Sequence, residues 1–326
     1  MVSALLILLC CLAASAQNVV LPDAPLPDGL QTIEFYSPAV DRTMKFDIVL
    51  PPDYEESDQH FPVLYLLHGY MQNYTVWGRF LGAAEHARRL GDLIIVMPDG
   101  GNSWYVNYHS SDNGQSNNWE DHVIDDVIGY VDQHFRTEAR KEGRAIAGLS
   151  MGGFGALSLG LRHSRLFISL GSTSGALSHA RTIAAAIRAG QLQAGSQPAI
   201  PANEALQQAD EQVSELIAIP EFGTQQERTP SGVAFATADQ AEAYDPFSII
   251  YDVPRSAMPH IYLDSGTGDQ LIRDARELAQ LLMVNNVPYD YRQAEGGHTA
   301  EYWRTAIGPM MAAQNEVMQR ALGNRP

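Results

Sequence analysis

The sequence predicts an α/β fold in which helices flank a mostly parallel central sheet. Two observations support this prediction. Short, continuously apolar runs such as FPVLYLLHGY and DLIIVMPDGG end in Gly or Asp, as is typical of buried parallel strands. Stretches with apolar residues at helical spacing follow such runs, so strands and helices alternate along the chain. Because single α/β units often reach 326 residues, we expect one domain over residues 17–326.

The predicted strands are short apolar runs bounded by turn residues. The first, MKFDIVLPPDY, alternates between apolar and polar residues and stops at paired prolines. The others follow in chain order as FPVLYLLHGY, DLIIVMPDGG, RAIAGLS, LFISLGSTSG, MPHIYLDSG and PYDYRQA.

The clearest predicted helix lies in NWEDHVIDDVIGYVDQHF, where apolar residues recur on one face at a spacing of about 3.6. Asn118 is a suitable N-cap, and Glu120 and Asp121 suit the positive end of a helix. Further helices are predicted in FGALSLGLRH, IRDARELAQLLMVNN and AIGPMMAAQNEVMQRAL.

Residues 176–245 interrupt this alternation. The segment is rich in Ala and Gln and contains helical pieces and loops but no convincing strand. We expect a helical, cap-like insertion that packs over the C-terminal edge of the sheet. The alternative is a disordered, low-complexity excursion.

The first 17 residues, MVSALLILLCCLAASAQ, form an apolar run that ends in a small-x-small pattern. This pattern predicts a signal peptide over residues 1–16 and a secreted or periplasmic protein. No Lys or Arg precedes the apolar run, which leaves a buried helix or a retained anchor as alternatives. Cys10 and Cys11 are the two cysteines of the chain, so the mature protein would have no disulfide, cysteine metal site or cysteine nucleophile.

The net charge is −17, and residues 1–16 contribute no charged side chain to it. A chain this acidic repels phosphate backbones and anionic lipids. We therefore expect neither nucleic acid nor a membrane surface as a partner.

The residues Gly148 to Gly152 match the pattern G-x-S-x-G between a predicted strand and a predicted helix. Such a turn holds its serine in strained backbone geometry, and side chains two residues away on either side would collide. The pattern predicts that Ser150 is a nucleophile at a helix N-terminus. The backbone N–H of Met151 would then donate to an oxyanion.

A serine nucleophile needs a base, and in this arrangement the base is a histidine that follows it in the chain. Of the histidines after Ser150, His163 lies in a predicted helix, His179 in the insertion and His260 in a strand. His298 stands on a Gly-Gly loop after the last predicted strand. We therefore predict His298 as the base.

The acid that orients the base is expected after the strand MPHIYLDSG, where three aspartates occur. Asp264 ends the strand, and Asp274 lies on the next helix, where we expect it to face solvent. Asp269 lies on the Gly-rich loop between them and has the freedom to reach His298. We favour Asp269 over Asp264.

A second oxyanion donor is expected from the loop after the strand VLYLLHGY. The His68-Gly69 turn would aim the backbone N–H of Tyr70 at the site. We expect the His68 side chain itself to be structural.

The stretch GGNSWYVNYHSSDNGQSNNWE follows a strand and should lie at the active-site edge of the sheet. Its aromatic residues could stack on an aromatic acyl group or a sugar, or equally pack the loop against the body of the protein. These residues are Trp104, Tyr105, Tyr108 and Trp119. The nearby histidines and acids have no recognisable metal-ligand spacing, so we expect no metal at His109, Asp112, Glu120, Asp121 or His122.

Taken together, LYLLHGY, MPDGGNSWY, RAIAGLSMGGFGAL, YLDSGTGD and EGGHTAEYW resemble motifs of one α/β-hydrolase esterase family. It includes esterase D (S-formylglutathione hydrolase), bacterial feruloyl esterases and mycobacterial mycolyltransferases. The similarity covers roughly residues 30 to 322. It implies a single α/β-hydrolase domain without a cofactor, in which Ser150, Asp269 and His298 are the nucleophile, acid and base, and Tyr70 and Met151 supply the oxyanion donors.

Differences within the family narrow the expectation. S-formylglutathione hydrolases are cytosolic and usually carry a cysteine near the oxyanion loop, whereas this mature chain would have none. No broad apolar stretch suggests a site for a long acyl chain. We expect a secreted serine carboxylesterase for small or aromatic esters, acting on a small-molecule or cell-wall substrate. The alternatives are an acyltransferase, a formylglutathione hydrolase and an inactive hydrolase-fold binding module.

Overall fold

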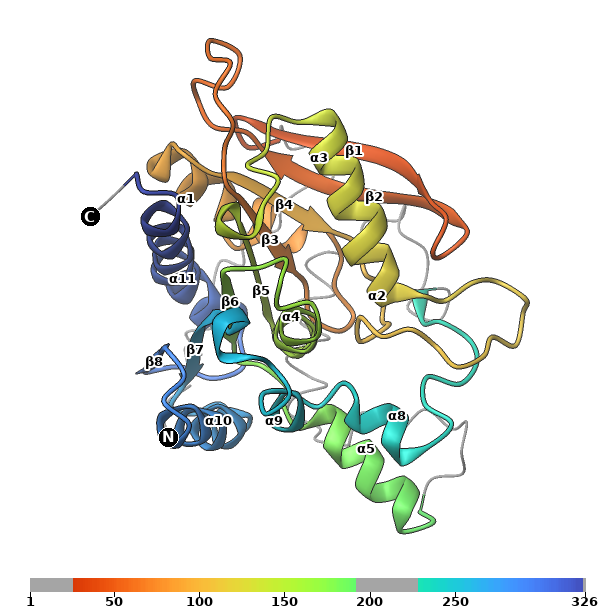
Figure 1. Cartoon of the computed structure of the whole chain (residues 1–326). Helices are drawn as coiled ribbons and strands as arrows, with labels where there is room; N and C mark the ends of the chain where they lie inside the picture. The colour runs from red at the N-terminus through yellow and green to blue at the C-terminus, as the bar shows by residue number, and fades with distance from the viewer. Residues whose placement is uncertain (1–25, 192–227, 325–326) are drawn as a thin grey trace, which may run out of the picture.

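A computed structural model describes residues 26–191 and 228–324. The central sheet has eight strands in the order β1-β2-β4-β3-β5-β6-β7-β8 (Figure 1). Neighbours along β4-β3-β5-β6-β7-β8 are parallel, whereas β2 pairs antiparallel with both β1 and β4. The predicted α/β class is confirmed. The strands are β1 Leu30–Ser37, β2 Arg42–Val49, β3 Val63–Leu67, β4 Ile94–Pro98, β5 Arg144–Leu149, β6 Ser169–Thr173, β7 His260–Gly266 and β8 Tyr289–Ala294.

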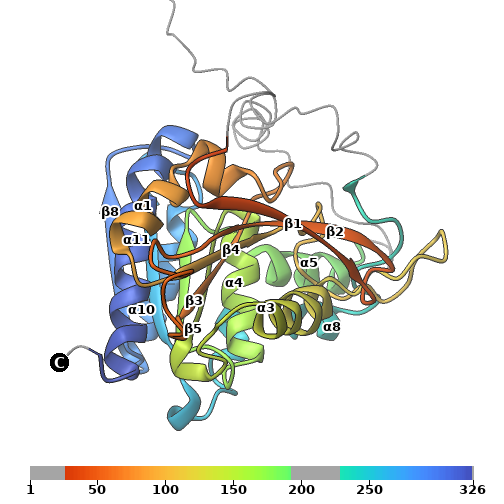
Figure 2. The same cartoon turned by 90° about the horizontal axis from the view of Figure 1, so that it is seen from above.

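Helices cover both faces of this sheet. Seen from above, α1 and α11 lie on one side and α3 and α4 on the other (Figure 2). A π-helical turn over His122–Val127 joins α2 to α3, so one helical stretch runs through the predicted region. The helices are α1 Ala83–Leu90, α2 Trp119–Asp121, α3 Ile128–His134, α4 Met151–Arg162, α5 His179–Arg188, α8 Ala238–Glu242, α9 Pro246–Ile249, α10 Ile272–Val284 and α11 Ala300–Ala321.

The continuous apolar runs are explained by burial on both faces. In β3, Leu64 and Leu66 belong to the core beneath α1 and α11, whereas Tyr65 and Leu67 belong to the core beneath α3 and α4. Successive side chains of a strand point to opposite faces, so a strand covered on both sides needs apolar residues throughout.

Strand β1 and the start of helix α11 differ from the predictions. Strand β1 was not predicted, because only part of LQTIEFYS is buried and most polar residues of this edge strand face solvent. Helix α11 begins at Ala300 rather than near Ala306. Thr299 caps it by accepting a hydrogen bond from the Tyr302 N–H, and Pro309 lies inside the helix.

The described parts of the insertion pack on the body of the protein. Helix α5 lies beside α8, as Figure 1 shows. The Ala176 N–H donates to the Ser150 carbonyl over 3.1 Å. The insertion therefore begins directly against the strand-to-helix turn at Ser150. Residues 192–227 of the insertion, and the predicted signal peptide over 1–16, lie outside the described residues.

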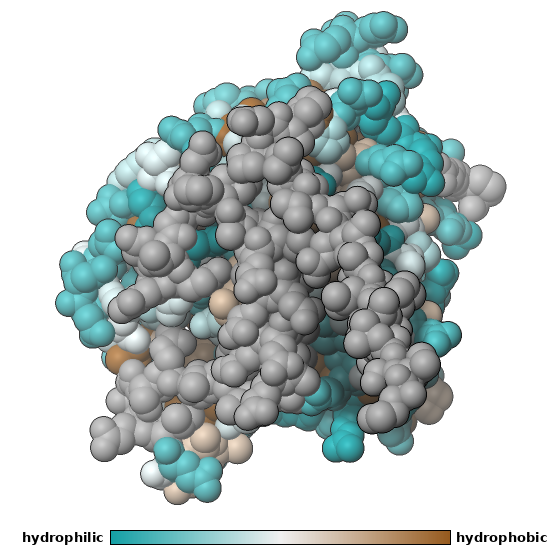
Figure 3. Space-filling view, turned by 180° about the vertical axis from the view of Figure 1, so that it is seen from behind, coloured by the Kyte–Doolittle hydropathy of each residue, from teal (hydrophilic) through white to brown (hydrophobic). Residues whose placement is uncertain are grey.

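On the face opposite to that of Figure 1, the surface that described residues form is largely hydrophilic (Figure 3). Within the described residues, no helix has both the length and the apolar character that a membrane crossing requires.

Candidate active site

Ser150 occupies the sharp turn between β5 and α4. Its backbone has φ 51° and ψ −117°, a strained conformation for a residue with a side chain. Met151 is the first residue of α4, so its N–H has no acceptor within the helix. The turn thus places a hydroxyl and a helical N–H that lacks an intrahelical acceptor at the same edge of the sheet.

Close backbone contacts explain why glycine occupies two positions of the G-x-S-x-G pattern. A Cβ atom on Gly148 would lie 2.9 Å from the Cα of Gly152 and closer still to its carbonyl group. A Cβ atom on Gly152 would lie 2.6 Å from the His68 carbonyl oxygen and closer still to that of Leu67. The end of β3 is therefore pressed against the start of α4, which holds the turn after β3 beside Ser150.

Ser150, His298 and Asp269 form one chain of hydrogen bonds. The Ser150 Oγ lies 3.0 Å from His298 Nε2, and His298 Nδ1 lies 3.1 Å from Asp269 Oδ2. All three residues are buried, with exposed fractions of 5%, 7% and 3%. This is the relative geometry that a nucleophile, its base and an orienting acid require.

Backbone hydrogen bonds hold the acid and base loops together. Asp269 comes from the loop between β7 and α10, and His298 from the loop between β8 and α11. The Gly268 N–H donates to the Gly296 carbonyl over 2.8 Å, and the Thr267 N–H donates to the Ala294 carbonyl over the same distance. The separation of the two side chains is therefore fixed by the backbone.

The surroundings of Asp269 favour its charged form. Burial opposes ionisation most strongly, but the hydrogen bonds from His298 and the Leu271 N–H outweigh it and hold the pKa of Asp269 below its ordinary value. The Leu271 N–H lies 2.8 Å from Asp269 Oδ1. A charged Asp269 accepts a hydrogen bond from His298 Nδ1–H. The neutral imidazole then has its lone pair on Nε2, which can accept a hydrogen bond from the Ser150 hydroxyl.

The two other aspartates of this region have different partners. Asp264 accepts hydrogen bonds from the Thr173 hydroxyl and from the Tyr302 hydroxyl, the latter over 2.9 Å. Burial raises its pKa to about 6, against the effect of these hydrogen bonds. Asp274 was expected to face solvent, but it is only partly exposed and accepts the Ser178 N–H over 2.9 Å at the start of α5.

The turn that carries Tyr70 spans residues 69–72. The Gln72 N–H donates to the Gly69 carbonyl over 3.2 Å, and the Gly69 N–H donates to Gln72 Oε1 over 2.8 Å. Met71 has φ 61°, and its N–H donates to Asn102 Oδ1 over 2.8 Å. This segment, which we call the oxyanion turn, therefore has a fixed backbone next to Ser150.

His68 is fully buried and takes part in backbone hydrogen bonds. Its Nε2 accepts the Gly100 N–H over 2.9 Å, so Nδ1 carries the proton and donates to the Gly69 carbonyl over 2.7 Å. The ring thus links the loop after β4 to the oxyanion turn, in the structural position that the sequence suggested.

Two of the four candidate substrate-contacting aromatic rings are covered by protein. Tyr105 is fully buried and donates its hydroxyl to the His68 carbonyl over 2.9 Å. Trp119 is 2% exposed and lies beneath the Arg42 guanidinium. The packing alternative therefore applies to these two rings, because neither has a face left for a ligand. Tyr108 and Trp104 are each 8% exposed, so they too are buried in this structure.

Trp104 belongs to an aromatic cluster beside the serine. Its ring stacks on His179, with 3.4 Å between centroids and 4° between planes, and contacts Phe154 edge to face at 5.8 Å. The Tyr70 ring lies 6.1 Å from it. We call these four residues the aromatic wall. The Phe154 N–H donates to the Ser150 carbonyl, so the wall begins within one helical turn of the nucleophile.

The histidines and acids considered for a metal have separate partners. His122 contacts the Ser37 hydroxyl with one ring nitrogen and the Asp99 carbonyl with the other. Glu120 forms ion pairs with Arg162 and His163. Across residues 26–191 and 228–324, no group of three or more His, Cys, Asp or Glu is placed to hold a metal ion.

The fold and this site define an α/β-hydrolase with a serine, histidine and aspartate in hydrogen-bond contact. The model of the family described as "Putative esterase" matches residues 37–313. The chain belongs to this esterase family.

Similar proteins agree with this placement. Esterase Rv1288 of Mycobacterium tuberculosis strain H37Rv is 30% identical over 81% of this chain, and the chain spans only 54% of that relative's length. An acetyl esterase of Caldicellulosiruptor saccharolyticus is 24% identical over 86% of this chain and 95% of its own. A fluorophosphonate-binding serine hydrolase F of Staphylococcus aureus has the same fold, with a TM-score of 0.65, 20% identity, and coverage of 88% and 98% of the two chains.

Sequence reasoning did not identify two parts of this site. His179 was set aside as a base candidate and was not recognised as a neighbour of the nucleophile, because its stacking partner Trp104 is distant in the chain. Arg228, which contacts the oxyanion turn, had no local motif to mark it. Both residues lie in the insertion, where only the folded arrangement reveals their partners.

Proposed function

We propose that the protein is an exported serine carboxylesterase that hydrolyses small or aromatic carboxylic esters through an acyl-enzyme on Ser150. The hydrogen-bonded chain from Ser150 through His298 to Asp269 carries this proposal. The acidic composition and the apolar N-terminal segment support a neutral substrate and export.

In the first half of the reaction, His298 Nε2 takes the proton of the Ser150 hydroxyl as Oγ attacks the ester carbonyl carbon. Asp269 accepts the Nδ1 proton in a hydrogen bond and stabilises the imidazolium. The backbone N–H groups of Met151 and Tyr70 donate to the oxyanion of the tetrahedral intermediate. The imidazolium then protonates the leaving alcohol, which departs and leaves the acyl group on Ser150.

In the second half, water takes the place of the alcohol. The water oxygen attacks the acyl carbon while His298 accepts a proton from this water. The backbone N–H groups of Met151 and Tyr70 stabilise the second oxyanion. Collapse of this intermediate returns the proton to Ser150 Oγ and releases the carboxylic acid. The aromatic wall beside Ser150, of which Tyr70 and His179 are the partly exposed members, suits contact with a short or planar acyl group.

The proposal is tested by initial rates on p-nitrophenyl butyrate, methyl ferulate, acetylated xylan and S-formylglutathione. Ser150→Ala should lose turnover by on the order of 10³-fold or more, because the covalent step is removed. Ser110→Ala, on an exposed loop, is the matched control and should keep the wild-type rate. Turnover that survives in Ser150→Ala would overturn the assignment of the nucleophile.

Three further measurements test the finer parts of the proposal. A fluorophosphonate should add one label to the wild type and to Ser110→Ala but none to Ser150→Ala. Product analysis with an added alcohol distinguishes water from an alcohol as the acyl acceptor, and a predominant new ester would make the protein an acyltransferase. N-terminal sequencing of the exported protein should begin at Gln17.

A further inference from the structure

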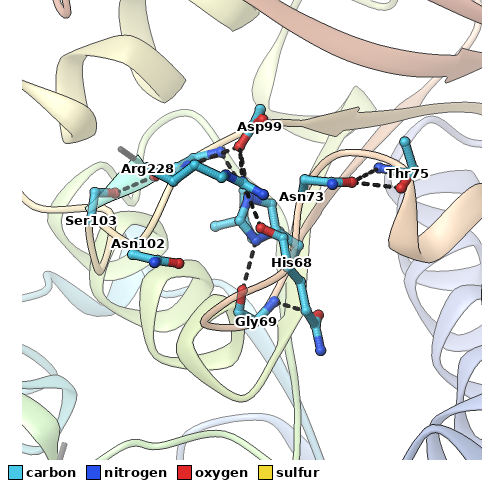
Figure 4. A network of polar contacts seen from close by, with 12 residues as sticks. His68, Gly69, Asn73, Thr75, Asp99, Asn102, Ser103 and Arg228 are labelled. Atoms are coloured by element: carbon cyan, nitrogen blue, oxygen red, sulfur yellow. Dashed lines mark hydrogen bonds and ion pairs between the residues drawn. The ribbon is translucent and has the colours of Figure 1, made fainter. Parts of the chain in front are cut away.

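A buried ion pair lies against the oxyanion turn, on the side of the loop after β4 (Figure 4). Arg228 Nη2 is 2.8 Å from Asp99 Oδ1, and the two side chains are 10% and 16% exposed. The same Nη2 donates to the Gln72 carbonyl over 2.6 Å. One guanidinium nitrogen therefore connects a buried carboxylate to the last residue of the oxyanion turn.

The segment of Arg228 also supports the middle of the turn. The Asn102 N–H donates to the Arg228 carbonyl over 3.2 Å, and Asn102 Nδ2 donates to the Thr229 hydroxyl over 3.0 Å. Asn102 Oδ1 in turn accepts the Met71 N–H. The groups that flank Tyr70 on its C-terminal side, the Met71 N–H and the Gln72 carbonyl, are thus both fixed by contacts that lead to residues 228 and 229.

Asp99 completes the support from the other side. Its Oδ1 accepts the Gly101 N–H over 2.9 Å and lies 3.3 Å from His68 Nε2. Burial opposes ionisation of Asp99 most strongly, but the Arg228 guanidinium and the Gly101 N–H outweigh it and hold the pKa of Asp99 well below its usual range. Asp99 is therefore charged at neutral pH, and Arg228 is the cation that balances it.

We propose that Arg228 is a positioning residue for the oxyanion turn: through Asp99, the Gln72 carbonyl and Asn102 it holds the Tyr70 N–H where the developing oxyanion needs a donor. This inference rests on the proposed function. It assigns a residue of the insertion a part in the chemistry of the site. Displacing a donor by about 1 Å can cost on the order of 10²-fold in rate, so loosening this support should act on turnover.

The test compares Arg228→Gln with Arg144→Gln, each normalised to the active sites that a fluorophosphonate titrates. Arg144 forms a similarly buried ion pair with Asp132 at the first residue of β5, the end of that strand remote from Ser150. We expect Arg228→Gln to lower kcat by about 10- to 100-fold with little change in KM. Arg144→Gln should keep kcat within about threefold of the wild type.

A readout specific to the oxyanion separates positioning from general damage. The inhibition constant of a boronic acid, whose tetrahedral adduct places an oxygen at the oxyanion donors, should weaken in Arg228→Gln by about the same factor as kcat/KM. The acid limb of the pH–rate profile should not move, because His298 and Asp269 are untouched. A kcat close to wild type, an unchanged inhibition constant or an equal loss in Arg144→Gln would each overturn the inference.

A double variant addresses the unpaired charge that Arg228→Gln leaves at Asp99. Asp99→Asn/Arg228→Gln removes both charges and should recover thermal stability, because an unpaired buried charge is costly. Its kcat should remain low, since the contact to the Gln72 carbonyl is still lost. Recovery of both properties would mean that Arg228 acts only as a counter-ion. If Ser150→Ala were active, the proposed function would fail separately from this test.

Discussion

Substituting Gly152 by alanine is the sharpest test of how the nucleophile turn is built. The added methyl group would lie 2.6 Å from the His68 carbonyl oxygen and closer to that of Leu67, where the neighbours are backbone atoms and no side chain can rotate away. Real Cβ contacts start near 3.0 Å, so β3 and α4 must separate by several tenths of an ångström or more. This shift moves the oxyanion turn relative to Ser150.

We expect Gly152→Ala to lower kcat/KM by on the order of 10²-fold, because the donors and the nucleophile move apart. Overpacking against backbone should also lower the free energy of unfolding by about 1–3 kcal/mol or more. Urea unfolding and p-nitrophenyl butyrate hydrolysis measure the two effects on the same samples.

Gly129→Ala is the matched control, since it makes the same chemical change elsewhere. Gly129 lies in α3, is exposed, and has no neighbouring atom within 4 Å of the place that the alanine methyl group would take. Alanine should stabilise this helix by about 0.5–1 kcal/mol and leave activity unchanged. A Gly152→Ala protein as stable and active as the wild type would refute the account of the turn.

Two further predictions concern groups near the site. Because burial raises the folded-state pKa of Asp264 to about 6 from 3.8, the folded protein resists its ionisation, and stability should fall as pH rises from about 4 to about 6. Asp264→Asn should therefore raise the free energy of unfolding at pH 7.5 by up to about 3 kcal/mol, and should give no gain below pH 4. Denaturant titrations at the two pH values measure this difference, and equal effects at both would contradict the prediction. His179→Ala should raise kcat/KM for bulkier acyl esters over acetyl esters by several-fold, because it removes the ring stacked on Trp104; unchanged selectivity across an acyl series would exclude His179 from the acyl site.

The sequence predicted those features that depend on local pattern or chain order. The turn at Ser150 is five residues long and needs Gly148 and Gly152, so their spacing can be recognised in the sequence alone. Asp269 and His298 were chosen because parallel strands bring their C-terminal loops to one edge. The structure places both beside Ser150, and their catalytic roles remain predictions.

Other features depend on contacts that no local pattern encodes. Strand β1 has an edge position and only partial burial, so its alternation is weak. Asp274 forms a hydrogen bond with Ser178, and Trp104 stacks on His179, although the residues of each pair are far apart in the chain. Tyr105 and Trp119 are residue types that often stack on ligands, so the sequence does not show whether they bind a substrate or pack the loop. Their burial in the structure shows that they pack the loop.

The insertion is attached near the active site at two points, and this has a consequence for how the protein can change. Its first residue, Ala176, donates to the Ser150 carbonyl, and Arg228, further along the insertion, donates to the oxyanion turn. We expect that the segment between these two attachment points can be replaced only if the hydrogen bonds of Ala176 and Arg228 are kept. Transplanting the segment between relatives should therefore preserve the geometry around Ser150 when the transplanted segment includes residues 176 and 228.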